Sequence, residues 1–228
     1  MIYAVGDIHG MRSELEKLIS LLPLDRDDTL VFIGDYVDRG PDSAGVVDTL
    51  IELQGKYRCI FLMGNHESMF LSFLGWEGSW YFGGDSFLQN GGDLTLQSYD
   101  FVEGSNFELP EAHRRFYQEL VPYHLEGEYA FVHAGVSRQA LALSDVTYAL
   151  SRERPRDLLW ERSTMELPHS LGITLVYGHT PMPDLQVRWN LPYTVGIDTG
   201  CVYDGGLTAV RLPDETVFRV DAMNAPEP

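Results

Sequence analysis

Cysteine is scarce in this chain, whose 228 residues include only Cys59 and Cys201. Each lies alone in or beside an apolar segment, without the paired spacing of a structural zinc site or of a redox motif. Cysteine-based metal binding and redox catalysis are therefore excluded. We expect both thiols to be small buried side chains in a reducing compartment.

Long hydrophobic runs are also missing, although 44% of the residues are apolar. No uninterrupted apolar stretch reaches the roughly 18 residues that a membrane-spanning helix needs. The chain begins directly in a strand pattern, and the basic and apolar segments of a secretory signal are not seen. We expect a cytoplasmic protein, not bound to a membrane, that folds as one domain over residues 1–228.

Positively charged residues are few. The chain has 16 lysines and arginines against 34 aspartates and glutamates, which gives a net charge of -18 at pH 7. Proteins bind the phosphate backbones of nucleic acids through clustered lysines and arginines. This charge balance argues against a nucleic-acid partner.

What the chain does have is a repeated pattern in which an apolar run ends in Asp, His or Asn. Ligands of open α/β sheets bind at the carboxyl ends of the strands, where such side chains form metal or catalytic sites. A single polar residue at a strand end is more often a cap or a turn residue. The runs and their polar residues are Ile2–Val5 before Asp7 and His9, Val31–Ile33 before Asp35 and Asp38, Cys59–Met63 before Asn65 and His66, Tyr129–Val132 before His133, and Thr174–Tyr177 before His179.

The first third of the chain predicts two β-α-β units. Apolar residues recur at helical spacing over Met11–Leu22 and again from Ser43 to Leu53. These two helices would connect the strands at Ile2, Leu30–Ile33 and Cys59–Met63 by right-handed crossovers.

The alternation breaks down between about residues 68 and 125, where Trp76–Gly84 is rich in aromatics and glycine. We expect a helical insertion over the site, including a helix over Pro110–His124. Alternatively, these aromatics pack a small core of the insertion itself. After His133 we expect loops through Pro168. The predicted closing strands are Leu175–Gly178, Thr194–Ile197, Leu207–Leu212 and Thr216–Val220, the last three as an antiparallel meander.

The motifs GDIHG, GDYVDRG, GNHE, VHAG and YGHTP occur in this order along the chain. Together they resemble the metal-binding motifs of the bacterial phosphoprotein phosphatases, a family of the calcineurin-like metallophosphoesterases. The resemblance extends from Gly6 to Gly200, and five ordered motifs are far more specific than one. It implies an α/β fold with two packed mixed β-sheets flanked by helices, a four-layer sandwich.

The resemblance also implies two divalent metal ions, Mn or else Fe or Zn, since hard oxygen and imidazole ligands suit these metals. A water held between two such ions loses a proton near neutral pH and attacks phosphorus directly. Two divalent ions with two carboxylate ligands leave a locally positive centre, whatever the distant surface carries. The implied ligands are Asp7 and His9 for the first ion, Asp35 as the bridge, and Asn65, His133 and His179 for the second.

Four further residues have implied catalytic roles. His66 would protonate the leaving alkoxide, and Asp38 would orient its imidazole. Arg39 presents a fork that matches two phosphate oxygens. Arg162 is the candidate for a second phosphate-binding arginine, although it and the nearby Arg152, Arg154 and Arg156 can also be read as solvated loop charges.

One further segment and one further residue complete the expected site. Gln89–Leu96 resembles a segment that helps line the substrate groove in bacterial members. Tyr203 would reach the phosphate, or else is a packed core tyrosine.

The implied function is hydrolysis of phosphoserine and phosphothreonine in proteins, with phosphotyrosine as a further substrate, by a monomer acting on phosphoproteins or phosphopeptides. Symmetrical diadenosine tetraphosphatases are the alternative, since they share the metal motifs. They typically lack the Asp38–Arg39 pairing, which favours phosphoproteins here. A non-catalytic module that binds phosphoproteins is a third reading, but such a module would not need Asp38 and His66 together.

Overall fold

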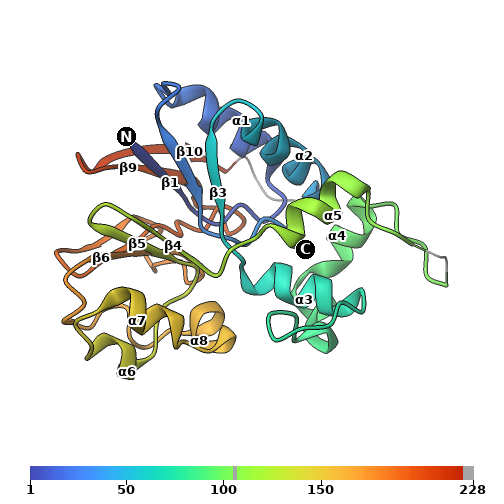
Figure 1. The fold of residues 1–228 in the computed structure, drawn as a ribbon. Helices are drawn as coiled ribbons and strands as arrows, with labels where there is room; N and C mark the ends of the chain where they lie inside the picture. The colour runs from blue at the N-terminus through green and yellow to red at the C-terminus, as the bar shows by residue number, and fades with distance from the viewer. Residues whose placement is uncertain (105–106, 223–228) are drawn as a thin grey trace.

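The computed structural model describes residues 1–104 and 107–222, and it shows two five-stranded β-sheets packed face to face. Helices α1 and α2 cover the outer face of the first sheet, and α6, α7 and α8 cover that of the second (Figure 1). The four-layer α/β sandwich with two mixed sheets is confirmed. The other helices lie at one end of the sheets, on the right of Figure 1.

The first sheet has the strand order β10-β9-β1-β2-β3. Its strands β1, β2 and β3 run parallel, as the two predicted β-α-β units require, while β9 pairs antiparallel with both β1 and β10. The elements are β1 Ile2–Val5, α1 Arg12–Leu21, β2 Thr29–Phe32, α2 Ser43–Gln54, β3 Arg58–Phe61, β9 Gly206–Leu212 and β10 Thr216–Asp221.

The second sheet has the order β4-β5-β6-β8-β7. Strands β5, β6 and β8 are parallel, and the edge strands β4 and β7 are antiparallel to their neighbours. Its strands are β4 Tyr123–Glu126, β5 Tyr129–Val132, β6 Thr174–Tyr177, β7 Arg188–Asn190 and β8 Thr194–Gly196.

The predicted three-strand meander is wrong in one strand. The strand at Thr194 is β8, which pairs in parallel with β6 of the second sheet, whereas β9 and β10 form a hairpin in the first. The chain crosses from one sheet to the other between Ile197 and Gly206. Local spacing predicts neighbouring strands as a hairpin and carries no signal for this change of sheet.

The predicted helix over Pro110–His124 is too long. Helix α5 spans Glu111–Gln118, and Tyr123–Glu126 is the edge strand β4. Pro122 has no amide hydrogen and favours an extended residue before it. The preceding Val121 indeed bridges to Leu62, and its N–H donates to the carbonyl of Phe61 at 3.0 Å.

The stretch between His133 and Pro168 contains short helices rather than loops alone. These helices begin with ordinary capping signals, since Ser137 and Asp145 accept N–H bonds from Ala140 and Tyr148, and Pro155 opens the third. They pack an apolar cluster against the second sheet. The helices are α6 Arg138–Leu141, α7 Val146–Ser151 and α8 Pro155–Trp160.

The segment between β3 and β4 is mostly helical, and many of its aromatic rings pack on one another. The ring of Phe70 lies 5.4 Å from that of Phe87 and 5.7 Å from that of Tyr99, centroid to centroid. The small-core interpretation concerns Trp76–Gly84, where Trp76 and Tyr81 pack edge-on with 5.4 Å between ring centroids and all four aromatic side chains are partly buried against this cluster. The elements are α3 Asn65–Phe73, the 3-10 turns η1 Gly84–Ser86 and η2 Leu88–Asn90, α4 Gly92–Ser98 and α5.

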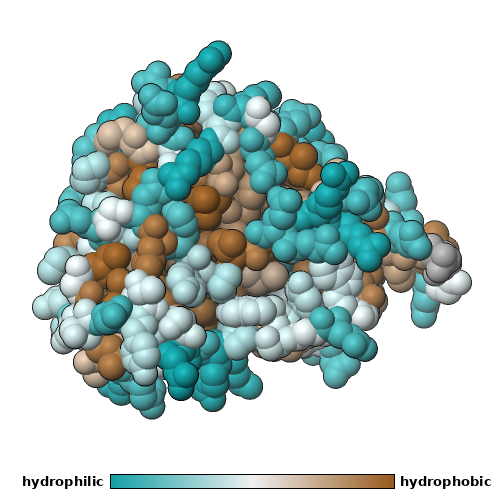
Figure 2. All heavy atoms as spheres, viewed as in Figure 1, coloured by the Kyte–Doolittle hydropathy of each residue, from teal (hydrophilic) through white to brown (hydrophobic). Residues whose placement is uncertain are grey.

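Strand alternation builds the core between the sheets. Val31 and Ile33 face the second sheet, where Phe131 and Val176 meet them, while Phe32 packs under the helices of the first sheet. Hydrophilic residues cover most of the face in Figure 2, and apolar residues come to the surface mainly over the strands on its left. Among the described residues, no helix is both long and apolar enough to cross a membrane.

Candidate metal and catalytic site

The site lies where the parallel strands of both sheets end. Strands β1, β2 and β3 of the first sheet and β5, β6 and β8 of the second are each followed within a few residues by a polar side chain. All six predicted ligands gather at this edge. Asp198, which follows β8, joins them although the sequence analysis gave it no role. The residues are Asp7, His9, Asp35, Asn65, His66, His133, His179 and Asp198.

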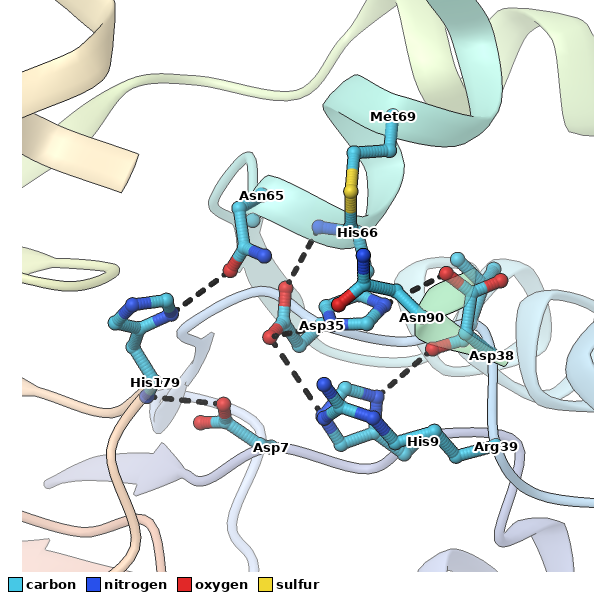
Figure 3. Close-up of polar contacts among 12 residues, drawn as sticks. Asp7, His9, Asp35, Asp38, Arg39, Asn65, His66, Met69, Asn90 and His179 are labelled. Atoms are coloured by element: carbon cyan, nitrogen blue, oxygen red, sulfur yellow. Dashed lines mark hydrogen bonds and ion pairs between the residues drawn. The ribbon is translucent and has the colours of Figure 1, made fainter. Parts of the chain in front are cut away.

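Two groups of buried side chains have the geometry of metal sites. The potential ligand atoms of His9, Asp35 and His66 all lie within 4.8 Å of one another, as do those of Asp35, His133 and His179. Asp35 belongs to both groups, as expected for a bridging ligand. In Figure 3 it lies between His179 on one side and His9 and His66 on the other.

The predicted ligands Asn65 and Asp7 lie beside these groups. The amide oxygen of Asn65 is 2.9 Å from His133 Nε2 and 2.8 Å from His179 Nδ1. One oxygen of Asp7 accepts the backbone N–H of His179 at 2.9 Å. His66, expected to stay off the metals, is the third member of the first group.

The donor set fits divalent metal ions. Asp7 Oδ1 and His179 Nε2 are buried without a hydrogen-bond partner among the described residues, which is costly unless an ion or ligand engages such groups. Burial, reinforced by the charges of Asp198 and Asp35, raises the pKa of Asp7. Burial also raises the pKa of Asp198 to about 7. Carboxylates crowded in this way favour cations between them.

The histidines of the site are held in the form that binds metals. Burial lowers the pKa of His9 and His133, and it lowers that of His179 to about 2, so these imidazoles stay neutral at pH 7. For Asp35, burial opposes ionisation, but its electrostatic interaction with the surrounding histidines, His133 foremost, brings its pKa below the usual value. Neutral imidazoles around an ionised carboxylate are a normal ligand set for Mn, Fe or Zn.

Backbone strain is concentrated at the site. Among the described non-glycine residues with positive φ, His9 has φ 49°, Asp35 54°, Asp38 73°, Arg39 69° and His179 68°. Such conformations cost free energy and persist where the surroundings enforce them, typically at functional sites. The strand-end loops are therefore shaped to aim these side chains inward.

Glu67 holds the loop that carries Asp35. Its carboxylate accepts N–H bonds from Asp35 and Tyr36 at 2.9 and 2.7 Å, and others from Val37 and Gly64 at 3.2 and 3.0 Å. Burial raises the pKa of Glu67 to about 8, while these backbone donors favour its ionised form. The motif GNHE was identified in the sequence, but this supporting role was missed. An acidic residue in the first turn of α3 was the available signal.

His66 and Asp38 form the predicted pair. His66 Nδ1 lies 2.6 Å from Asp38 Oδ2, and both side chains are buried. Thr95 of α4 holds the carboxylate: its hydroxyl donates to Asp38 Oδ1 at 2.6 Å and accepts the Asp38 N–H at 2.8 Å. Thr95 belongs to Gln89–Leu96, the segment predicted to line the substrate groove. This segment thus holds the Asp38 side of the His66–Asp38 pair in place, which the sequence did not reveal.

Arg39 lies over the first metal group. Its Nη1 is 2.7 Å from His9 Nε2, and its guanidinium carbon is 5.4 Å from the ring centroid of Tyr203. Tyr203 is 49% exposed, so the interpretation as a packed core residue is wrong. It stands at the rim of the site, against Arg39.

Arg162 lies on the other side of the site. Its Nη1 donates to Thr180 Oγ1 at 2.9 Å, next to the ligand His179. Arg39 and Arg162 both lower the pKa of Asp198 against its burial. Arg154, by contrast, is exposed and pairs with Asp157 through two hydrogen bonds, as a loop charge would.

Comparison with known proteins agrees with this geometry. The family description "Calcineurin-like phosphoesterase" matches residues 1–221. The chain is 30% identical to an asymmetrical bis(5'-nucleosyl)-tetraphosphatase from Anoxybacillus flavithermus, over 95% of this chain and 93% of that one. A similar enzyme from Geobacillus is 29% identical over 93% and 91%.

A crystal structure of a candidate diadenosine tetraphosphatase has the same fold, with a TM-score of 0.67 at 23% identity over 98% of this chain and 94% of that one. The family match spans both sheets and every strand-end ligand loop of the site. This chain therefore belongs to the calcineurin-like phosphoesterases, a family of phosphoester hydrolases, and it brings together His and Asp side chains that could hold metal ions.

Proposed function

We propose that this phosphoesterase hydrolyses bis(5'-nucleosyl) tetraphosphates and cleaves them asymmetrically. The observation that carries this proposal is the end-to-end similarity, at 30% identity, to a relative named for that reaction. Asymmetrical cleavage of a tetraphosphate yields a nucleoside triphosphate and a monophosphate. The sequence alone suggested symmetrical cleavage as the alternative, which would yield two diphosphates.

The site would hold two divalent ions, with Mn as the proposed metal. Asp7 and His9 would bind the first ion, Asp35 would bridge, and Asn65, His133 and His179 would bind the second. When bound, such ions polarise phosphoryl oxygens and lower the pKa of bound water. Asp35 is the residue best placed to contact both ions, since it belongs to both groups of potential ligands.

The residues around the ions have distinct proposed tasks. Arg39 and Arg162 approach from opposite sides and would bind the oxygens of the reacting phosphate. His66, oriented by Asp38 at 2.6 Å, would hold the proton for the leaving oxygen. Asp198 would add negative charge near Asp7 and so strengthen cation binding.

Hydrolysis of phosphoserine and phosphothreonine in proteins is the second candidate. The buried His66–Asp38 pair favours it, because a serine alkoxide is a strongly basic leaving group that needs a proton donor. A nucleotide leaves through a phosphate oxygen, which is much less basic, so the pair is less necessary in that reaction.

One experiment separates the two candidates. Chelator-stripped protein is reloaded with Mn, and rates are compared on diadenosine tetraphosphate, a phosphoserine peptide and a phosphotyrosine peptide. We expect the dinucleotide to have the highest kcat/KM and to give a triphosphate and a monophosphate on ion-exchange chromatography. Faster peptide hydrolysis would establish the second candidate instead, and binding without turnover would indicate a phosphoprotein-binding module.

A further inference from the structure

A cavity of about 360 Å³ lies beside the metal groups and has no role in the chemistry above. Its lining comes from the insertion and from α8 with the residue that follows it, two parts of the chain that are far apart in sequence. This volume is in the usual range for small-molecule sites, roughly 300–1,000 Å³. The lining residues are Phe82, Arg156, Asp157, Trp160 and Glu161.

Both walls of this cavity are tied to elements that carry metal ligands. The ring of Trp160 packs edge-on against that of His179, with 5.8 Å between centroids. On the opposite wall, the N–H of Phe82 donates to Ser68 Oγ at 3.1 Å, and that hydroxyl donates to the Phe82 carbonyl at 3.2 Å. Ser68 belongs to α3, which also carries Asn65. On one wall a single side chain, Trp160, separates the cavity from His179, and the other wall is fixed to the helix that carries Asn65.

The acidic residues of the lining are already engaged. Asp157 receives two hydrogen bonds from Arg154, and Glu161 Oε1 accepts the N–H of Arg162 and both the N–H and the hydroxyl of Ser163. Their charges are thus partly compensated. They do not exclude a ligand that brings phosphate groups to the nearby site.

Three groups of the lining remain free to recognise a ligand. Phe82 and Trp160 offer aromatic surface, and both are only partly buried. Arg156 is exposed and has no ion pair within the described part of the chain.

Aromatic surface and a free guanidinium together suit a heteroaromatic base attached to a phosphate. We propose that this cavity binds the base of one nucleoside of the substrate, with Arg156 on an adjoining phosphate. This inference deepens the proposed function and rests on it for the identity of the substrate. The cavity is then the reason that a nucleotide is preferred to a simple phosphoester.

The test uses competitors that differ only by the base. Hydrolysis of p-nitrophenyl phosphate by the Mn-loaded protein is inhibited with adenosine 5'-monophosphate or with ribose 5-phosphate. The nucleotide should inhibit about tenfold more strongly, a modest value for stacking one base on an aromatic ring. Phe82→Leu keeps the apolar bulk but removes the flat ring, so most of that difference should disappear. Phe82→Tyr keeps the ring and should retain it.

A matched control is Tyr148→Ala, which removes an exposed aromatic ring of α7 outside the cavity and the metal site. It should behave as the wild type. Equal inhibition by the two competitors in the wild type, or an unchanged difference in Phe82→Leu, would overturn the proposal. A raised KM for a phosphopeptide alone in Phe82→Leu would do so too, because the cavity would then be a peptide subsite.

The competition assay does not require dinucleotide hydrolysis, so the two proposals can fail separately. If diadenosine tetraphosphate is not cleaved but the base-dependent inhibition is seen and lost in Phe82→Leu, the proposed function fails and the base site stands. If the dinucleotide is cleaved and the competitors inhibit equally, the base site fails alone. If both hold, Phe82→Leu should also raise the KM for the dinucleotide about tenfold with little change in kcat.

Discussion

At the scale of single residues, the site depends on side chains that the backbone forces into place. His9, Asp35 and His179 have left-handed backbone conformations, which are uncommon outside glycine and persist where the surroundings constrain the loop. Glu67 supplies part of that constraint by accepting the N–H groups of the Asp35 loop. The ligands are therefore preorganised before any ion binds, which reduces the cost of binding it.

His66→Asn tests the proposed proton donor at this scale. Because general acid catalysis contributes roughly 10²–10⁴-fold, we expect kcat/KM for an alkyl phosphate such as phosphoserine to fall about 100-fold or more. Aryl and nucleotide leaving groups need less protonation, and their rates should fall less than about tenfold. Rates are measured with metal content checked by mass spectrometry. Equal losses on all three substrates would show that His66 acts otherwise, for example as a metal ligand.

At the scale of elements, helix α4 is linked to the loop after β2 by one side chain. The Thr95 hydroxyl bonds both the carboxylate and the N–H of Asp38, and Ser43 Oγ lies 2.9 Å from it. The insertion therefore does more than cover the site. It sets the orientation of the His66–Asp38 pair.

Thr95→Val removes the hydroxyl and keeps the shape, and it tests this link. We expect kcat to fall about tenfold, with KM and metal content little changed, because Asp38 loses a buried partner and no longer fixes the imidazole. The pH profile of kcat should also shift, which a merely structural defect would not cause. Thr95→Ser keeps the hydroxyl and serves as the rescue. An unchanged pH profile in Thr95→Val would contradict the positioning role.

At the scale of the whole molecule, repulsion between negative charges makes the stability of the fold depend on bound cations. The net charge is -18, and Asp7, Asp35 and Asp198 are buried close together at the edge where both sheets end. Cations at this edge would offset repulsion that the metal-free protein must tolerate. Metal ions bound at this edge should thus also hold the two sheets together and raise the free energy of unfolding.

Metal removal tests whether bound ions stabilise the fold in this way. Mn at about 100 times its Kd should stabilise the fold by about 2.7 kcal/mol, which corresponds to a rise in Tm of roughly 5 °C for a chain of this size. Differential scanning calorimetry of stripped and reloaded protein measures the change. Asp35→Asn, which removes the shared ligand, should abolish most of the rise. A Tm that is the same with and without Mn would argue against metal binding across the sheets.

The sequence by itself determined the chemistry of the site. Each predicted ligand follows an apolar run within a few residues, and local rules of strand and turn formation suffice to place Asp7, Asp35 or His133 at a strand end. Helices α1 and α2 were likewise predictable, because their apolar spacing is local. What the five motifs did not determine is the substrate, since metal ligands are shared by enzymes that differ in the groups around them.

The tertiary structure alone decided which distant segments meet. Strand β8 pairs with β6 across a change of sheet, and this pairing brings Asp198 beside Asp7. Thr95 bonds Asp38, which is 57 residues away along the chain. Trp160 packs against His179 at the wall of the cavity that Phe82 and Arg156 also line. Pairing and packing over such separations depend on the whole core, so no local pattern encodes them. The positions of the predicted ligands at the strand ends therefore followed from the chain, whereas the residues that support them and the cavity beside them did not.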